Sequence, residues 1–346
     1  MAIGHDLSVN EPASNAPVFY REGDGDRHEL DGLTICVVGY GHLGASMAGN
    51  LRDAGLTVTI GNIDDEYRAA ARSDGFVVGD IDAMVAAADV VYVLIADEVI
   101  PETFRASITP ALRDGAAVCF ASGYCLAYGL VEPAPDVDVL MLAPRMVGDE
   151  VRRAVVDGTG YVSYVSVEQD ATGQALQRLL AVADAAGALR VGALQLTATQ
   201  EATLDLFIEQ TVGPYLGTAI QLAFELGTAA GLPAEAMVLE LYQSGEMSRT
   251  FESFANAGFY RSVTAHGVTA QYGGFLRTLE LDHQQLRNHF NAVLDDIRAG
   301  GFAAKLQQEG DDGYPTMRSI EGITAGTDPM SQAEDRVRRA LGPHAS

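Results

Sequence analysis

Basic residues and long apolar runs are scarce in this chain, and each scarcity excludes a class of protein. Tryptophan is absent from the 346 residues, and 22 lysines and arginines face 47 aspartates and glutamates, for a net charge of −25. A chain this acidic repels polyanions, which excludes nucleic acids and anionic membrane surfaces as partners. No apolar run reaches the roughly 18 residues of a membrane span.

Targeting and cross-linking signals are equally scarce. The first 30 residues are polar and mixed in charge, without the apolar core of a signal peptide. The three cysteines, Cys36, Cys119 and Cys125, are an odd number and lack metal-type spacing. We therefore expect a reduced protein in the cytoplasm.

The most informative segment, residues 34–44, reads TICVVGYGHLG. It is a short apolar strand followed by a Gly-x-Gly-x-x-Gly turn, and a helical pattern begins at Ala45. This is the arrangement that binds dinucleotide phosphates: Gly39 allows the turn, Gly41 admits the pyrophosphate, and Gly44 lets strand and helix pack closely. The alternative is a tight turn without a ligand. The other turn positions that we expect to line a cofactor are Tyr40, His42 and Leu43.

Apolar runs alternate with helical patterns over the first half of the chain, which predicts a doubly wound α/β domain. We expect a mobile arm over residues 1–17, a Rossmann domain over 18–196, a helical domain over 197–322 and a polar, frayed tail over 323–346. The expected strands are residues 34–38, 57–60, 90–95, 117–120, 138–142 and 161–166. Residues 190–196 form either a last strand or a linker. The expected later helices cover residues 169–186, 199–231, 233–247 and 275–300.

The segment after the second strand favours NADH over NADPH. It reads GNIDDEYR over residues 61–68, so acidic residues come before the first cation, Arg68. Asp64 lies 20 residues after Gly44, where a carboxylate accepts hydrogen bonds from the ribose of NAD and repels the 2′-phosphate of NADP. The alternative is that Asp64 and Asp65 cap the next helix.

Twelve short blocks, read in order, resemble ketol-acid reductoisomerase of the short, class I type over about residues 18–318. They are Val18–Tyr20, Val38–Gly41, Asn50–Gly55, Asp89–Val91, Asp97–Val99, Gly115–Ala117, Phe120–Gly123, Ala143–Arg145, Val151–Arg153, Gln169–Gly173, Asp205–Gln210 and Gly231–Glu235. The resemblance implies an N-terminal Rossmann domain, a knotted helical C-terminal domain and an intertwined homodimer or larger homo-oligomer. It also implies that Asp97, Val99 and Gly148 lie beside the cofactor.

That family converts 2-acetolactate to 2,3-dihydroxyisovalerate by a Mg²⁺-dependent alkyl migration followed by reduction with NAD(P)H. The resemblance implies that Asp205, Glu209 and Glu240 are metal ligands. Asp205 and Glu209 are four residues apart, so they share a helix face. We expect this helix to be well buried because its neighbours Leu204, Leu206, Phe207 and Ile208 are apolar. We also expect residues 215–232 to be buried in a core or against a partner, since they are apolar around most of a helix.

The chain departs from the family where substrate and metal should bind. Ser244 replaces a fourth metal-binding Glu, which weakens a second Mg²⁺ site in particular. Ser122 replaces a His, and Arg145 replaces a Lys. Cys125 replaces an Asn, and Ala265–Val268 replaces a serine-rich block, which introduces His266.

These departures lead us to expect a reductase that acts on a 2-oxo acid, a hydroxy-oxo acid or an imine, with the isomerase step impaired or lost. Arg145 would stabilise a developing oxyanion or hold a carboxylate, and His266 or Glu209 would supply the proton. For His266 the alternative is an ordinary loop histidine, and for Ser122 a small residue that fills space. Two other functions stay open: a complete Mg²⁺-dependent ketol-acid reductoisomerase, and a nucleotide-binding relative without catalysis.

Overall fold

The computed structural model describes residues 16–262, 267–321 and 326–342, and the chain divides into two compact units after Ala202. The expected boundary, after residue 196, lies six residues earlier. Most of the expected N-terminal arm and His266 fall outside the described residues. Among the described residues, no helix combines the length and apolar character that a membrane crossing requires.

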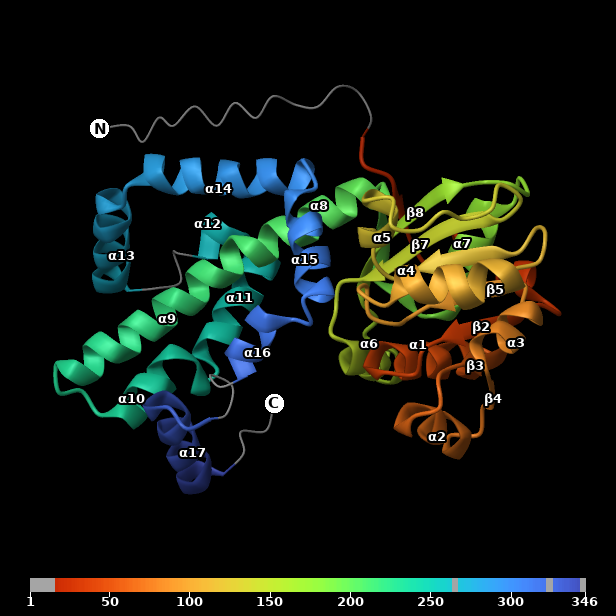
Figure 1. The fold of residues 1–346 in the computed structure, drawn as a ribbon. Coiled ribbons are helices and arrows are strands. Elements are labelled where there is room, and N and C mark those ends of the chain that lie inside the picture. Colours follow the sequence, from red (N-terminus) through yellow and green to blue (C-terminus); the bar gives the residue numbers. More distant parts are fainter. Residues whose placement is uncertain (1–15, 263–266, 322–325, 343–346) are drawn as a thin grey trace. The chain divides into compact units, whose positions relative to one another are not determined.

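The first unit is built on a nine-stranded sheet in the order β1-β9-β8-β7-β6-β5-β2-β3-β4 (Figure 1). Strands β2 to β7 run parallel to one another, and β8 returns antiparallel to β7. The bounds are β1 (Phe19–Tyr20), β2 (Thr34–Val38), β3 (Thr57–Gly61), β4 (Val77–Gly79), β5 (Val90–Val93), β6 (Ala117–Phe120), β7 (Asp138–Pro144), β8 (Val162–Gln169) and β9 (Gly192–Gln195). The six expected strands are confirmed, and the segment left open at 190–196 contains a strand.

The central strands are apolar throughout because helices cover both faces of the sheet. Every residue of β5, β6 and β7 is buried. Helix α1 packs against α6 and α7, and α3 packs against the π-helical segment η2 (Figure 1). The helices of this unit are α1 (His42–Asp53), α2 (Glu66–Ser73), α3 (Ile81–Ala86), α4 (Ile100–Thr103), η2 (Phe104–Ile108), α5 (Tyr124–Ala127), α6 (Gly148–Val156) and α7 (Ala175–Ala185).

The helix expected from residue 169 begins later than predicted. Strand β8 continues to Gln169, and α7 begins only at Ala175. Between them, the Asp170 carboxylate accepts the amides of Gly173 and Ala175. The chain therefore makes a side-chain-stabilised turn, which competes with the helix at these positions.

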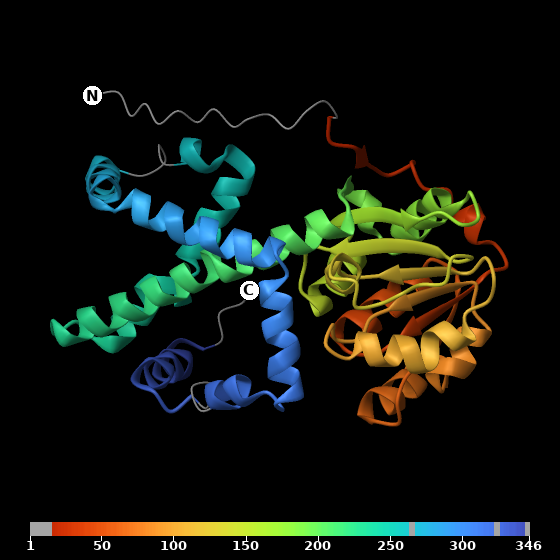
Figure 2. The ribbon, with the colours of Figure 1, turned by 45° about the horizontal axis from the view of Figure 1, so that its top comes forward.

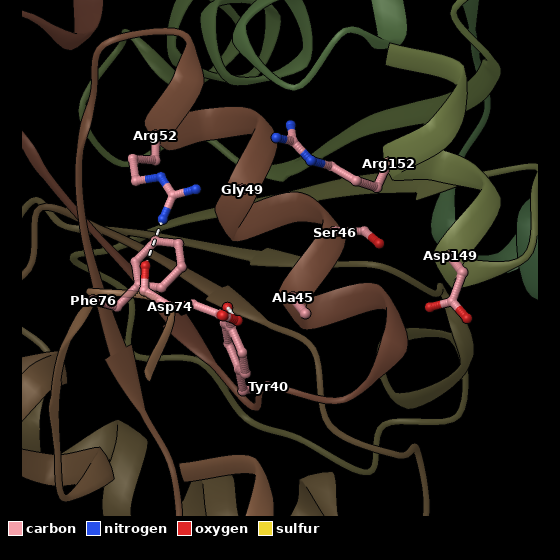
Figure 3. Close-up of a pocket in the computed structure, with 9 residues that line it drawn as sticks. All are labelled: Tyr40, Ala45, Ser46, Gly49, Arg52, Asp74, Phe76, Asp149 and Arg152. Carbon is pink, nitrogen blue, oxygen red and sulfur yellow. Dashed lines mark hydrogen bonds between the residues drawn. The ribbon is translucent and has the colours of Figure 1, made fainter. Parts of the chain in front are cut away.

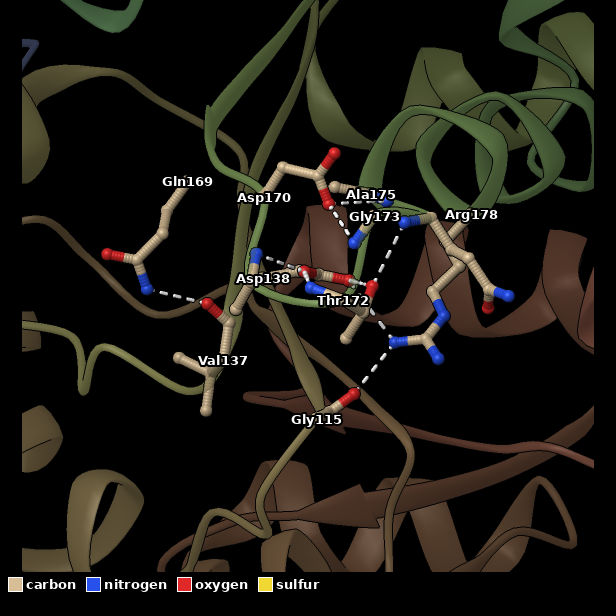
Figure 4. A network of polar contacts seen from close by, with 11 residues as sticks. Gly115, Val137, Asp138, Gln169, Asp170, Thr172, Gly173, Ala175 and Arg178 are labelled. Carbon is tan, nitrogen blue, oxygen red and sulfur yellow. Dashed lines mark hydrogen bonds and ion pairs between the residues drawn. The ribbon is translucent and has the colours of Figure 1, made fainter.

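A buried polar network secures this turn at the opposite end of the sheet from the glycine-rich segment (Figure 4). Asp138, the first residue of β7, is fully buried. Its carboxylate accepts hydrogen bonds from the amides of Ala171 and Thr172, from the Thr172 hydroxyl and from Arg178. Arg178 also donates to the Gly115 carbonyl. Both carboxylate oxygens of Asp138 thus accept hydrogen bonds, as a polar group buried in the core requires.

The second unit is helical in its described parts. Helices α8 and α9 follow each other along the chain, and α14 crosses them (Figure 2), with Phe290 packed against Phe207 and Tyr215. The helices are α8 (Ala198–Gln210), α9 (Val212–Ala229), α10 (Ala234–Val238), η5 (Leu239–Gln243), α11 (Glu246–Ala257), α12 (Phe259–Ser262), α13 (Val268–Glu280), α14 (His283–Arg298), α15 (Gly301–Asp311), α16 (Pro315–Glu321) and α17 (Pro329–Leu341). The knot implied by the resemblance stays a prediction.

The three helical segments expected after residue 198 are confirmed as helical, but each is interrupted. Residues 199–231 hold two helices, which meet at Thr211. Residues 275–300 also hold two helices, because Asp282 caps α14 by accepting the Gln285 amide at 2.9 Å. The segment 233–247 is interrupted by the π-helical turn η5.

The tail expected to be polar and frayed contains a docked helix, α17. Its Ala333 and Val337 are buried in one cluster with Phe224 and Val238. The Tyr242 hydroxyl bonds the Glu334 carboxylate, and Arg336 pairs with Glu235. These two buried positions are four residues apart and form one narrow apolar stripe on a helix that is otherwise polar. The average polarity of the segment, on which the prediction of a frayed tail was based, does not reveal such a stripe.

Candidate active site

The glycine-rich turn between β2 and α1 has the geometry that its sequence predicts. Gly39 has φ +97°, and a Cβ there would lie 2.6 Å from the Leu94 carbonyl oxygen. A Cβ on Gly44 would collide with the Gly39 carbonyl, whereas a Cβ on Gly41 would meet no other protein atom within 4 Å. Gly41 is also the N-cap of α1 and offers no side chain to cap it. The turn thus leaves space and unpaired amides at a helix N-terminus, which suits a phosphate group.

Strand order places this turn at the point where ligands bind in open α/β sheets. Strand β2 lies between β3 and β5, where the order of connections reverses. Asp97 and Val99 follow β5 at the same edge, and Gly148 follows β7. A Cβ on Gly148 would lie 2.7 Å from the Leu43 amide nitrogen, so α6 begins in direct contact with the turn. The neighbouring His42 and Asp149 side chains approach to 3.0 Å.

The two aspartates after β3 have different surroundings. Asp65 is the N-cap of α2 and accepts the Arg68 amide at 2.9 Å. Asp64 is exposed at the end of the strand. The helix-capping alternative therefore holds for Asp65, while Asp64 keeps the position that a ribose-binding carboxylate needs. The ribose role of Asp64 stays a prediction.

Tyr40 belongs to the protein interior, although we expected it to line the cofactor. Its side chain is 5% exposed, its hydroxyl donates to Asp74 at 2.8 Å, and its ring packs edge-on against Phe76. Burial raises the pKa of this phenol well above its ordinary value, and the hydrogen bond to Asp74 raises it further. Only the backbone of Tyr40 shapes the turn, where its amide donates to Asn62.

The same side chain lines a hollow of about 350 Å³ along α1 (Figure 3). Tyr40, Asp74 and Phe76 lie on one side of the helix, and Asp149 and Arg152 of α6 lie on the other. Its cations have protein partners: Arg52 donates to the Asp74 carbonyl, and Arg152 bonds Asn50 and Asp53. The hollow is thus a groove along α1 that is lined by both positive and negative side chains. Its charge therefore does not favour an anionic ligand.

Arg145 is held by a carboxylate that the sequence analysis missed. An Nη2 atom of Arg145 lies 2.9 Å from Oε1 of Glu201, whose side chain is fully buried. The other oxygen of Glu201 accepts the Gly123 amide at 2.7 Å, and the guanidinium lies 4.9 Å from the centre of the Tyr164 ring. A signal was present, because Glu201, Asp205 and Glu209 recur every four residues on one face of α8.

Ser122 and Cys125 lie on either side of Gly123, whose amide bonds Glu201. The Ser122 hydroxyl accepts the Tyr124 amide at 3.1 Å, which supports the start of α5. Cys125 is buried, and its thiol donates to the Asp97 carbonyl at 3.5 Å. Burial and the acidic neighbours Asp97 and Glu98 raise the pKa of this thiol to about 12. Cys125 is therefore a neutral packing residue between two loops at the cofactor edge.

The three expected metal ligands lie on two elements of the second unit. Asp205 is half-buried and Glu209 exposed on α8, while Glu240 is exposed on the π-helical turn η5. Such turns often occur at functional sites. Ser244 follows this turn, and its hydroxyl accepts the Glu246 amide at 3.3 Å. Within the part of one chain that the structure describes, no three His, Cys, Asp or Glu side chains form a group able to hold a metal ion.

The expectation that α8 is well buried is wrong for the single chain, and of the two alternatives for α9, burial in its own core does not hold. Leu204 and Ile208 of α8 are 38% and 45% exposed. On α9, Leu222 and Leu226 are 50% and 69% exposed. Apolar exposure of this extent on adjacent helix turns is typical of interaction surfaces.

Comparison with known proteins matches both units to one family. The model of the acetohydroxy acid isomeroreductase NADPH-binding domain matches residues 29–192, and that of the ketol-acid reductoisomerase C-terminal domain matches residues 199–342. A putative ketol-acid reductoisomerase 3 from Saccharolobus solfataricus is 34% identical over 325 residues, which cover 92% of this chain and 96% of the relative. A ketol-acid reductoisomerase (NADP⁺) from Pyrobaculum calidifontis is 35% identical over 306 residues, 87% and 92% of the two chains.

A solved structure agrees with the sequence relatives. An NADH-preferring ketol-acid reductoisomerase from an uncultured archaeon superimposes with a TM-score of 0.88 at 30% identity. The match covers 94% of this chain and 99% of that one. The phosphate-binding turn, the doubly wound sheet and the helical second unit are therefore those of a known enzyme architecture, and this chain belongs to the ketol-acid reductoisomerase family as an NAD(P)H-dependent oxidoreductase.

Proposed function

We propose that the protein catalyses the complete ketol-acid reductoisomerase reaction, the conversion of 2-acetolactate to 2,3-dihydroxyisovalerate in branched-chain amino-acid biosynthesis. The observation that carries the proposal is the retention of Asp205, Glu209 and Glu240 within a C-terminal domain that matches the family over its whole length. The relatives favour this reaction over the reductase-only activity that the departures led us to expect.

The donor set fits Mg²⁺. Asp205 and Glu209 present two carboxylates one helical turn apart, and Mg²⁺ is commonly held by one or two carboxylates together with waters and substrate. When bound, Mg²⁺ polarises the hydroxyl and carbonyl oxygens of the substrate as a Lewis acid. Glu240 would complete the ligand set. Because the described part of one chain does not gather three such side chains, a complete set requires a second copy or a rearrangement.

Arg145 is the residue that we assign to the substrate anion. It follows β7 at the cofactor edge of the sheet, and Glu201 and the Tyr164 ring fix its guanidinium. A guanidinium held in this way keeps a fixed orientation at the cofactor edge, which suits interaction with a carboxylate or a developing alkoxide. Arg145 does not donate its proton at neutral pH. The proton source therefore remains with Glu209 or His266, and Ser122 is assigned a supporting role.

The cofactor that we propose is NADH. Asp64 is exposed at the end of β3, where it accepts hydrogen bonds from a ribose and repels a 2′-phosphate. The glycine turn with the backbone of Tyr40 and with His42 and Leu43, together with Asp97, Val99 and Gly148, would surround the rest of the dinucleotide.

We also propose that the chain acts as a homodimer or larger homo-oligomer. Besides α9, helices α12 and α13 expose Phe259, Tyr260, Tyr272 and Leu279 by 61–75%. Phe259, Tyr260 and Phe275 line a largely apolar hollow of about 470 Å³. Faces of this kind are normally covered in an oligomer. Light scattering of the purified protein would show the mass of at least two chains, and a monomer at micromolar concentration would contradict the assignment.

A second function, reduction without alkyl migration, is favoured by two observations. Ser244 removes a carboxylate from the turn that carries Glu240, and the buried Glu201 neutralises Arg145. The two functions differ in their need for the metal. We expect NADH oxidation with 2-acetolactate to saturate with Mg²⁺ and to disappear in Asp205→Asn, whereas Asp295→Asn, an exposed change on α14, would leave it intact. No turnover of 2-acetolactate at saturating Mg²⁺ would favour the second function.

A further inference from the structure

The first cation after β3, Arg68, is engaged by groups of the protein itself. Arg68 lies in the first turn of α2, three residues after the helix cap Asp65. An arginine near this strand end is the usual means of accommodating the 2′-phosphate of NADP. Here the side chain of Arg68 is only 12% exposed. Its guanidinium therefore points into the protein surface and not into the solvent above the strand ends.

A short chain of polar contacts holds Arg68 in this orientation. Its Nη1 atom lies 2.7 Å from Oδ1 of Asp80 and 3.3 Å from the Asn62 carbonyl oxygen. Asn62 also donates to Asp65 at 2.7 Å and accepts the Tyr40 amide of the phosphate turn at 3.2 Å. The end of β3, the start of α2 and the end of β4 are thus connected through one side chain.

Asp80 has the position of a residue that controls Arg68. It follows β4, whose Gly79 pairs with Gly61 of β3, so it lies beside the strand end where the ribose is expected. Its side chain is 75% exposed and makes no capping bond to α3, although Asp80 is the N-cap residue. Its carboxylate therefore has one evident function in the structure, which is to pair with Arg68.

We propose that Asp80 is a specificity-determining residue, which disfavours NADPH by keeping Arg68 in an ion pair, so that this arginine is not available to the 2′-phosphate of the ribose. This inference rests on the proposed preference for NADH. Two carboxylates then act on the same phosphate: Asp64 repels it directly, and Asp80 withholds the arginine that would bind it. Asp80 is a positioning residue, since it acts through Arg68.

Removal of the Asp80 charge should release Arg68. A largely buried guanidinium is stable only while it is paired, and the Nε atom of Arg68 has no hydrogen-bond partner among the described residues. Without the carboxylate, the long side chain gains hydration and rotamer freedom by turning outward, because the Asn62 carbonyl alone does not balance its charge. In that position it can pair with a 2′-phosphate.

The test measures the dissociation constants of NADH and NADPH for the intact protein by cofactor fluorescence. We expect Asp80→Asn to tighten NADPH binding by about three- to tenfold, as one exposed charge pair allows, and to change NADH binding by less than twofold. The gain should be lost in Asp80→Asn combined with Arg68→Gln, and it should diminish at high salt. Binding of 2′,5′-ADP should follow NADPH, and binding of 5′-AMP should follow NADH.

Asp82→Asn is the matched control. It removes the same charge two residues further on, in the first turn of α3, where the Asp82 carboxylate accepts the Ala83 amide and, among the described residues, bonds no arginine. An unchanged NADPH affinity in Asp80→Asn would overturn the proposal. So would a gain that survives without Arg68, or an equal gain in Asp82→Asn. The wild-type ratio of the two affinities tests the NADH preference separately, since a wild type that prefers NADPH contradicts that preference whatever Asp80→Asn does.

Discussion

Arg145 and Glu201 form a buried ion pair across the cofactor edge of the sheet, with 2.9 Å between guanidinium and carboxylate. Glu201 is fully enclosed and also accepts the Gly123 amide, so one carboxylate joins β7, the segment after β6 and the start of α8. The pair has two functions. It stabilises the packing of three segments, and it sets the direction of the arginine that we assign to the substrate.

Removing one member of this pair should cost much more stability than removing both. Glu201→Ala removes the buried carboxylate that pairs with the partly buried Arg145, and we expect it to lower the free energy of unfolding by about 3 kcal/mol. Glu201→Leu combined with Arg145→Met should recover most of that loss, since apolar residues of similar size replace the charges. Urea unfolding of the three proteins checks this. A double variant no more stable than Glu201→Ala would contradict the pairing.

Substitution of Arg145 should separate catalysis from cofactor binding. Arg145→Ala should lower turnover at least 100-fold, while the NADH dissociation constant changes less than about threefold, because Arg145 lies outside the phosphate turn. Arg145→Lys, which restores the lysine that the family has at this position, should retain measurable turnover. If NADH binding collapses in a protein that remains folded by circular dichroism, Arg145 contacts the cofactor instead.

The cofactor preference should depend on Asp64. Asp64→Asn removes the charge that repels a 2′-phosphate, and we expect the ratio of NADPH to NADH affinity to rise about fivefold. Asp65→Asn is a useful comparison, because it tests a helix cap and should mainly affect stability. A ratio that does not change in Asp64→Asn would show that Asp64 has no role at the ribose.

Ser244→Glu would restore the missing carboxylate beside Glu240. We expect it to lower the Mg²⁺ concentration needed for half-maximal turnover of 2-acetolactate, by about tenfold, because a second carboxylate adds charge to the weaker metal site. Glu246→Gln, on the next helix, should leave that concentration nearly unchanged. The same Mg²⁺ dependence in Ser244→Glu and wild type would mean that this turn does not face the metal.

The network around Asp138 predicts a purely structural effect. Asp138→Ala leaves the Thr172 amide and Arg178 without their buried acceptor, and we expect a loss of about 3 kcal/mol in stability. Turnover per folded molecule should stay within twofold of wild type, since the network lies at the sheet edge opposite the cofactor turn. Exposed Asp114→Asn serves as the control. A selective loss of activity would contradict this separation.

The sequence was informative where local signals and the required geometry coincide. The strand, turn and helix from Thr34 to Asp53 are contiguous, and glycine is needed there for steric reasons, so both element and function could be predicted. Strand β4 has only three residues, Val77–Gly79, with the glycine at its end, and such a short edge strand carries little periodic signal. The helix break at Asp282 could have been found from its capping pattern with Gln285.

The rest of the site depends on contacts between distant segments. The interaction of Glu201 with Arg145 joins residues 56 apart, and nothing at either position alone distinguishes a buried ion pair from a solvated one. Tyr40 was assigned to the cofactor from its place in the turn, but its rotamer directs it to Asp74, 34 residues away. The exposure of Leu222 and Leu226 could not be predicted for the same reason. An apolar helix pattern does not show whether the apolar face is covered by the helix's own chain.

The most direct test of the proposed function compares two substrates in one NADH-oxidation assay, with and without Mg²⁺. One is 2-acetolactate, and the other is the already rearranged 3-hydroxy-3-methyl-2-oxobutanoate. The complete reductoisomerase reaction predicts that both are reduced and that turnover of 2-acetolactate requires Mg²⁺. Reduction of the rearranged substrate alone would contradict that reaction and show that the reductase functions without the isomerase.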